Sequence, residues 1–237
     1  MSDSIRKQIF DLVETKIATA LKANGYQTDC GLHPYYGAVA GLEVPFINFL
    51  PGEESSLPER EYRRDSRTVR VTFEAGMQYV PGEKVSDLVE DMLADLIEVV
   101  AGQKWTLAFT SGGTYNIKTG HTVTGATSGA TAMVESVSLS TGAWAAGSVA
   151  GTLTLRRKSG TFVAENLDIG TNLNVCSIAA GATRVSPEAS TAGSLVEEIV
   201  YIGGGARSYP EAGDDIVGCY AEFNFTFYTL PGDPYNQ

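Results

Sequence analysis

The sequence predicts an α+β protein: a mixed or antiparallel β-sheet covered by two amphipathic helices, with a small all-β domain inserted. Two patterns indicate the sheet and its main helix. From Val69 to Ala75 apolar and polar residues alternate, the period of a strand with one buried face. From Val85 to Val100 apolar residues recur at helical spacing. The opposite face of this helix is acidic and carries Asp87, Glu90, Asp91, Asp95 and Glu98.

The segments before this unit predict a first helix and a second strand. Residues Ser4 to Ala23 have an apolar stripe at helical spacing, and Asn24-Gly25 is a suitable helix end because both residues tolerate positive φ. Residues 26–36 are a weaker strand or loop. Residues 42–50 (LEVPFINFL) predict a strand, in which Pro45 indicates a sheet edge or a strand start.

The composition changes at about residue 109 and changes back at about residue 192. Between them the chain is rich in Gly, Ala, Ser and Thr, and turn residues separate short β-prone pieces, as expected for a small all-β module. We expect strands at 131–139, 152–155, 161–164 and 174–178.

The pattern of the first hundred residues returns near the end of the chain. Residues 195–202 (LVEEIVYI) predict a strand, 203–215 a Gly/Pro-rich connection, and 216–228 a strand with strict alternation. Neither flank has enough strands for a sheet of its own. We therefore predict one discontinuous α/β domain, residues 1–104 plus 195–237, and an inserted β domain, residues 105–194.

The charge distribution also divides the chain. The net charge is -11, which disfavours a surface that binds nucleic acid phosphates. Residues 104–194 hold six of the 17 basic and four of the 28 acidic side chains, a balance of +2. The remainder holds 11 basic and 24 acidic side chains, a balance of -13.

The lengths of the apolar runs and the number of cysteines argue against a membrane protein and against a disulfide framework. No apolar run approaches the roughly 18 residues of a membrane span, and we find no signal-peptide pattern. Cys30, Cys176 and Cys219 are odd in number and widely spaced, so we expect reduced thiols and no zinc site.

A charged stretch, residues 51–66 (PGEESSLPEREYRRDS), has two interpretations. One interpretation is a solvated hairpin loop. The other is an interaction arm, because the stretch contributes to the one basic cluster of an otherwise acidic chain. Arginine forks bind carboxylates on a partner surface. The candidate interaction residues are Arg60, Arg63, Arg64, Arg67, Glu53 and Glu54.

We find no pattern of residues that predicts catalysis, a cofactor or a metal. No Gly-x-Ser-x-Gly elbow, phosphate-binding loop, His-x-x-x-His or paired-cysteine motif is present. Gly203-Gly204-Gly205 suits a hairpin tip better than an anion nest, since no helix start follows it. The acidic helix face is what a helix in water requires, so we do not assign it a metal.

The order of these segments resembles a known family. An amphipathic helix is followed by a strand ending in PGEE (51–54), then RTVRVTFEAG (67–76), the helix VSDLVEDMLADLIEVV (85–100) and a closing strand CYAEFNFTFYT (219–229). This order is similar to that of the tail terminator, or tail completion, proteins of long-tailed bacteriophages. The inserted segment GHTVTGATSGATAMVESV (120–137) is similar to small β modules of phage virion proteins, whereas compact members of the family lack an insertion.

The resemblance implies a structural virion protein made in the host bacterial cytoplasm. It would form a homo-hexameric ring that caps the head-proximal end of the tail tube, stops polymerisation and joins the tail to the head connector. Its partners would be itself, the tail tube protein and the connector or neck protein. DNA would pass through an acidic lumen without specific binding. Exposed sheet edges and the charged stretch are the candidate contacts for a head-to-tail ring.

Three alternatives remain from the sequence. One is another neck or tube ring protein. A second is a surface- or carbohydrate-binding virion protein that acts through residues 109–192, with Tyr115 and Trp144 as sugar-binding candidates. A third is an enzyme whose site surrounds His33.

Overall fold

The structure is a computed structural model that describes residues 3–39, 41–59, 63–208 and 215–237. It divides into two compact units. Unit 1 comprises Met1–Leu21, Tyr26–Gly102 and Pro187–Gln237, and unit 2 comprises Lys22–Gly25 and Gln103–Ser186.

Unit 1 contains a mixed five-stranded sheet of order β1-β2-β3-β12-β11, in which β1 is parallel to β2 and the other pairs are antiparallel. The alternation from Val69 to Ala75 lies in the central strand, as predicted. The strands are β1 (His33–Tyr36), β2 (Phe46–Glu59), β3 (Arg64–Gln78), β11 (Glu198–Ser208) and β12 (Ile216–Thr229).

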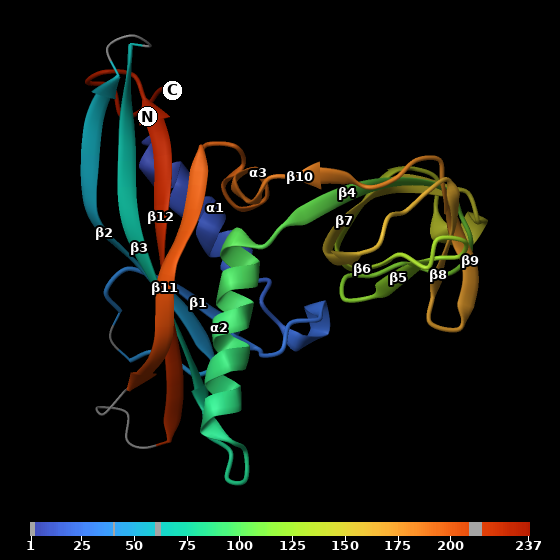
Figure 1. Ribbon diagram of the computed structural model, residues 1–237, viewed down its shortest axis with the longest axis horizontal. Helices are drawn as coiled ribbons and strands as arrows, with labels where there is room; N and C mark the ends of the chain where they lie inside the picture. Colours follow the sequence, from blue (N-terminus) through green and yellow to red (C-terminus); the bar gives the residue numbers. More distant parts are fainter. Residues whose placement is uncertain (1–2, 40, 60–62, 209–214) are drawn as a thin grey trace. The chain divides into compact units, whose positions relative to one another are not determined.

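The helices of unit 1 pack on one face of this sheet. α1 (Ile5–Ile17) and α2 (Val85–Ala101) share one apolar core with the buried side chains of β2, β3 and β12 (Figure 1). Phe10 of α1 lies 5.9 Å from Phe49 and 6.5 Å from Phe225, measured between ring centroids. Burying this face removes the apolar stripes of both helices from water, which is the main force holding them to the sheet.

The first helix is shorter than we predicted. It begins at the N-cap Ser4, whose side chain accepts from the N–H of Lys7, but it ends at Ile17. The next N–H groups bond in tighter turns: Thr19 N–H donates to Lys16 O and Ala20 N–H to Ile17 O. The Thr19 hydroxyl also donates to Lys16 O. These bonds satisfy the terminal carbonyls, so the helix need not continue.

A third helix, α3 (Pro187–Ala192), was not predicted, and it moves a domain boundary. We assigned residues 187–194 to the inserted domain, but they belong to unit 1. The Thr191 hydroxyl donates to Val100 O at 2.7 Å, and Ala192 is fully buried in the unit 1 core. A short helix of small polar residues has no periodic signal, so only its tertiary contacts identify it.

The stretch 51–66 is not the loop that one interpretation predicted. β2 runs through to Glu59 and β3 begins at Arg64, so most of the stretch is a β-hairpin. β1 pairs with β2 only from Phe46 to Phe49. Beyond that point one edge of β2 is unpaired among the described residues, and proline is tolerated on such an edge because it removes no ladder hydrogen bond.

The expected connection at 203–215 is also partly strand. β11 continues through Gly203-Gly204-Gly205 to Ser208, with an irregularity between Tyr201 and Gly203. Gly204 lies under α2: a Cβ at this position would come within 2.8 Å of the Leu93 side chain. Glycine therefore lets the helix approach the strand.

Unit 2 is a seven-stranded sheet of order β10-β4-β7-β6-β5-β8-β9 around its own apolar core. Thr110 of β4 also pairs with Ser177 of β9, which brings the far end of the sheet back to β4. The prediction of a strand at 161–164 was wrong, since these residues form no strand. The strands are β4 (Lys104–Gly112), β5 (Thr122–Gly125), β6 (Thr131–Thr141), β7 (Val149–Ser159), β8 (Glu165–Ile169), β9 (Asn172–Ile178) and β10 (Thr183–Val185).

Candidate interaction surface on the β2–β3 hairpin

The candidate interaction residues lie along the β2–β3 hairpin but in three different settings. Arg60 lies outside the described residues. Arg63 is at the turn, is exposed and has a φ of 50°. Glu53 is exposed at the irregularity of β2 between Pro51 and Glu54. Of the candidates that the structure describes, these two present their side chains to solvent.

Glu54 and Arg67 are engaged within the chain. One Glu54 carboxylate oxygen accepts from Arg67 at 3.0 Å, and the other accepts from Arg6 of α1 at 3.2 Å. Arg67 and Glu54 are about one-fifth exposed. This arrangement fixes the start of α1 to the sheet, so we assign both residues to the fold and not to a partner contact.

Arg64 is held by two contacts on the hairpin. Its Nε donates to Glu59 at 2.8 Å, across the strand pair, and its guanidinium lies 3.5 Å from the ring centroid of Tyr228 on β12. The hydrogen bond to Glu59 raises the pKa of Arg64. Stacking on an aromatic ring orients a guanidinium without removing its remaining donors. Arg64 therefore stiffens the base of the turn that presents Arg63.

The sheet face opposite the helices carries paired charges. Arg70 of β3 bonds Glu222 of β12, and Arg207 of β11 bonds Glu74 of β3 at 2.7 Å. Burial raises the pKa of Glu74, whereas the charge of Arg207 lowers it, and the net shift is upward. Each arginine here is matched by a carboxylate. These pairs therefore add no net charge to the sheet face, and the acidic excess of unit 1 comes from other residues.

The exposed acidic side chains that we predicted for α2 are present, with one correction. Asp87, Glu90 and Asp91 are exposed, but Asp95 is fully buried. Its carboxylate accepts from the Thr28 N–H and the Thr28 hydroxyl, both at 2.7 Å, and from the Gln27 N–H at 3.0 Å. Burial raises the pKa of Asp95, and these hydrogen bonds oppose the shift. Asp95 thus anchors the segment after α1 and is not part of a solvent- or lumen-facing surface.

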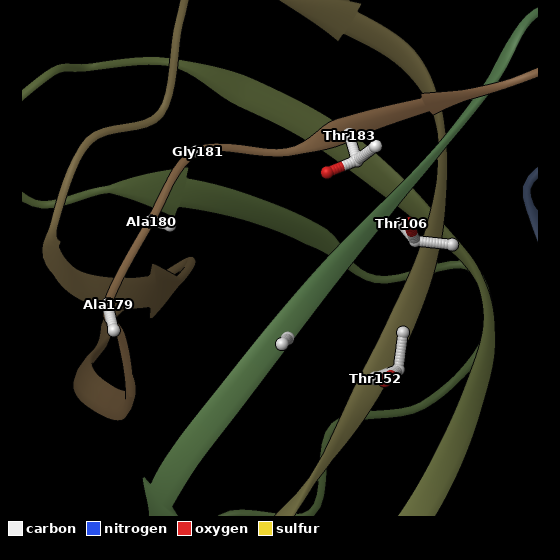
Figure 2. Close-up of a pocket in the computed structure, with 7 residues that line it drawn as sticks. Thr106, Thr152, Ala179, Ala180, Gly181 and Thr183 are labelled. Atoms are coloured by element: carbon white, nitrogen blue, oxygen red, sulfur yellow. The ribbon is translucent and has the colours of Figure 1, made fainter.

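Unit 2 contains a shallow pocket of about 270 Å³ (Figure 2). Its lining is made only of small side chains: Thr106, Ala108, Thr152, Ala179, Ala180, Gly181 and Thr183. Tyr115 and Trp144, the sugar-binding candidates, are not among them; both pack against the unit 2 core, and Trp144 stacks on Phe109 at 5.7 Å. The pocket offers hydroxyls but neither an aromatic platform nor a charge.

Two further sequence candidates have ordinary structural contacts. His33 Nδ1 lies 3.1 Å from Pro45 O, and its Nε2 lies 3.6 Å from a Glu43 carboxylate oxygen. Within the described ranges, no three His, Cys, Asp or Glu side chains gather as a metal site would require. The three cysteines are buried free thiols. No helix in the described part of the chain is long and apolar enough to cross a membrane.

The comparisons with known proteins add no family assignment. No protein-family model matches the chain, and no curated protein matches its sequence. The interaction surface therefore rests on the geometry described above.

Sequence reasoning missed the partners of the hairpin charges. No sequence motif connects the hairpin charges with Arg6, Glu59 or Tyr228. Arg6 and Tyr228 lie far from the hairpin in sequence, and Glu59 had no recognisable role. The period of two does place Arg70, Glu74 and Glu222 on the polar face of their strands. It does not give the register of β3 against β12, which decides the pairs.

Proposed function

We propose that this protein is a structural virion protein of a long-tailed bacteriophage, a tail terminator. It forms a ring, in our proposal a hexamer, that caps the head-proximal end of the tail tube and joins it to the head connector. Unit 2 is then a decoration inserted between α2 and the last strands of the terminator domain. The proposal rests on the order of elements that resembles the family.

The observation that supports it most is the pairing of β3 with β12. These strands are in register from Asp65↔Thr229 to Gln78↔Ile216, although unit 2 separates them in sequence. The segments that carry the resemblance therefore form one continuous sheet with α1 and α2 on one face. A terminator domain interrupted by an insertion requires this arrangement.

The proposed ring contact is the exposed end of the β2–β3 hairpin. Arg63 is exposed next to Arg64, which Glu59 and Tyr228 hold in place, and Glu53 is exposed on the same hairpin. A ring needs two different surfaces on each subunit that meet head to tail. Arg63 suits a carboxylate of the next ring or tube subunit.

The exposed carboxylates of α2 suit a lumen through which DNA passes. Asp87, Glu90 and Asp91 repel phosphates and so prevent DNA from adhering during ejection. Another neck or tube ring protein would share this property. We prefer a terminator because the resemblance is to that family.

Tube assembly distinguishes a terminator from a tube protein. Adding the protein to polymerising tube subunits should shorten the tubes, with the added protein at one end by electron microscopy. Incorporation along the whole tube would indicate a tube protein. No effect on tube length, together with only monomers by native mass spectrometry, would refute the ring.

The contact itself is tested by Arg63→Glu. This change should weaken ring or tube-end binding by at least tenfold while leaving thermal unfolding unchanged, because Arg63 is exposed. Lys118→Glu, an equal charge change at an exposed position of unit 2, is the matched control. If both variants assemble equally well, the hairpin is not the contact.

A further inference from the structure

A short turn from the N-terminal part of the chain, Lys22–Gly25, belongs to unit 2. The segment that follows it, Tyr26–Gly102, belongs to unit 1. The turn is closed by the Gly25 N–H, which donates to Lys22 O at 2.8 Å. Unit 2 therefore uses a piece of chain that lies outside the inserted segment, and no pattern in the sequence indicates this.

Arg156 of β7 binds the end of this turn. Its side chain is fully buried, and its Nη2 donates to Asn24 O at 2.6 Å. The next residue, Arg157, is exposed, and its Nη1 donates to Gly25 O at 3.4 Å. Carbonyl groups at the end of a short helical turn have no partner within the turn, and a guanidinium has several donors to offer them. Two successive carbonyls of the turn thus meet two successive arginines.

An irregularity in β7 allows both arginines to reach the turn. Successive side chains of a regular strand point to opposite faces of the sheet. Arg157 has a φ of 51°, and the pairing of β7 with β6 shifts between Met133 and Thr131. A bulge of this kind re-aims side chains, so Arg156 and Arg157 can serve the same short segment.

Two glycines let the turn pack closely against unit 2. A Cβ at Gly120, just before β5, would lie 2.7 Å from Ala23 O. A Cβ at Gly25 would collide with Met133 Sδ of β6 and lie 3.1 Å from Arg156 Nη2. Since β5, β6 and β7 are neighbours in the sheet, the turn contacts three adjacent parts of unit 2.

A second buried cation lies beside Arg156. Trp105 pairs with Leu155, so the antiparallel register places Lys104 opposite Arg156. Lys104 is fully buried, and its Nζ lies 3.4 Å from a Glu135 carboxylate oxygen. Like charges on facing strands repel, and a buried charge is stable only where acceptors surround it. The Asn24 carbonyl is one of these acceptors, so the turn contributes to the stability of the buried charges.

We propose that the turn Lys22–Gly25 is a structural part of unit 2 and that Arg156 is the residue that recognises it. The surface around Arg156, Gly120 and Met133 fits a tight bend of backbone that presents its carbonyls. A module cut out at Gln103 and Ser186 lacks this bend and is less stable than unit 2 of the full chain. This inference goes beyond the proposed function and does not rest on it, because it concerns unit 2 alone.

The test compares two glycine substitutions in the full chain. Gly120 and Gly129 both belong to unit 2 and have φ values of 84° and 66°, so alanine strains the backbone at both positions. A Cβ at Gly129 would meet nothing within 4 Å, whereas at Gly120 it would meet Ala23 O. Gly120→Ala should therefore displace the turn, and Gly129→Ala is the matched control.

Hydrogen exchange of the Gly25 amide, measured by NMR, follows the turn, and tryptophan fluorescence follows the unfolding of unit 2. Gly120→Ala should speed the exchange of this amide at least tenfold and lower the unfolding temperature of unit 2 more than Gly129→Ala does. Arg156→Met should have both effects as well, because it removes the donor to Asn24 O. Arg156→Lys keeps a donor and should restore part of the slow exchange.

Two results would overturn the proposal. One is a Gly25 amide that exchanges as slowly in Gly120→Ala as in Gly129→Ala. The other is an Arg156→Met variant in which unit 2 is less stable but the Gly25 amide exchanges at the wild-type rate, since Arg156 would then stabilise its own strands and not the turn. If Arg156→Met does not fold, the two glycine variants decide the question.

Discussion

At the scale of single residues, buried carboxylates stabilise this protein by accepting backbone hydrogen bonds. Asp95 holds the segment after α1 in this way, and Glu165 does the same in unit 2. The Glu165 carboxylate accepts from the N–H groups of Thr127, Ser128 and Val163 and from the Ser128 hydroxyl. The Asp95 bonds stabilise local structure more than a surface ion pair does, because the Thr28 donors are buried and would otherwise lack an acceptor.

Asp95→Ala should destabilise unit 1 by about 2 kcal/mol, since it leaves the Thr28 N–H and hydroxyl without their acceptor. The measurement is thermal unfolding followed by circular dichroism at the helix band, because α1, α2 and α3 all belong to unit 1. Asp91→Ala, an exposed position on the same helix, is the control. Equal melting temperatures for the two variants would contradict the anchoring role of Asp95.

The lowered pKa of Glu165 predicts that the stability of unit 2 depends on pH. Burial opposes its ionisation, but the hydrogen bonds from Ser128, Val163 and Thr127 outweigh burial and lower its pKa from 4.5 to about 2. A lowered carboxyl pKa stabilises the folded state fully above about pH 4.5, and this contribution is lost as the pH falls towards 2.

Trp105 and Trp144 both lie in unit 2, so tryptophan fluorescence follows the unfolding of that unit. Glu165→Gln should unfold at a lower temperature than the wild type at pH 6, and the difference should shrink as the pH falls. A difference that stays constant between pH 6 and pH 2 would exclude this role for Glu165.

At the scale of elements, the two ends of unit 2 are adjacent and unit 1 closes without it. Gln103 donates from its amide nitrogen to Val185 O at 2.6 Å, and Lys104 pairs with Val185. α3 follows directly and packs with α2. A deletion of the whole predicted insertion, residues 105–194, would therefore also remove α3, which belongs to the core of unit 1.

Replacing Gln103–Ser186 with a short Gly/Ser linker should leave unit 1 folded and cooperative in thermal unfolding. Extending the deletion to Ala192 should lower the melting temperature further, because it removes Thr191 and the buried Ala192. Circular dichroism of both variants provides the comparison. Loss of cooperativity in the shorter deletion would mean that the two units depend on each other for stability.

At the scale of the whole molecule, the charge predicts how the protein behaves towards DNA. The net charge is -11, and the arginines of the open sheet face are bonded to carboxylates. We expect no binding of double-stranded DNA at 150 mM salt, measured by fluorescence anisotropy, since the acidic excess of the chain repels the phosphates. Binding that weakens steeply between 50 and 200 mM salt would contradict the proposed passage of DNA through an acidic lumen.

The hydrophobic periodicity and the composition of the sequence by themselves determined much of the fold of this protein. The alternation at Val69–Ala75, the alternation near the C-terminus and the apolar stripe at Val85–Val100 identified the central strands and α2, because each pattern reports which face of an element is buried. The change in composition indicated a second unit. The hairpin arginines were identified as a cluster because they are basic residues in an acidic chain.

Only the tertiary structure decided what those residues do. Asp95 reads as one more polar residue of an acidic helix face, yet a loop far away in sequence covers it. Glu54 and Arg67 read as free charges, yet α1 and the strand register bring them together with Arg6. β11 reads as a strand followed by a glycine turn, yet its pairing with β12 continues through those glycines. Local sequence specifies which side of an element is apolar, whereas register and packing between distant segments specify which polar groups meet.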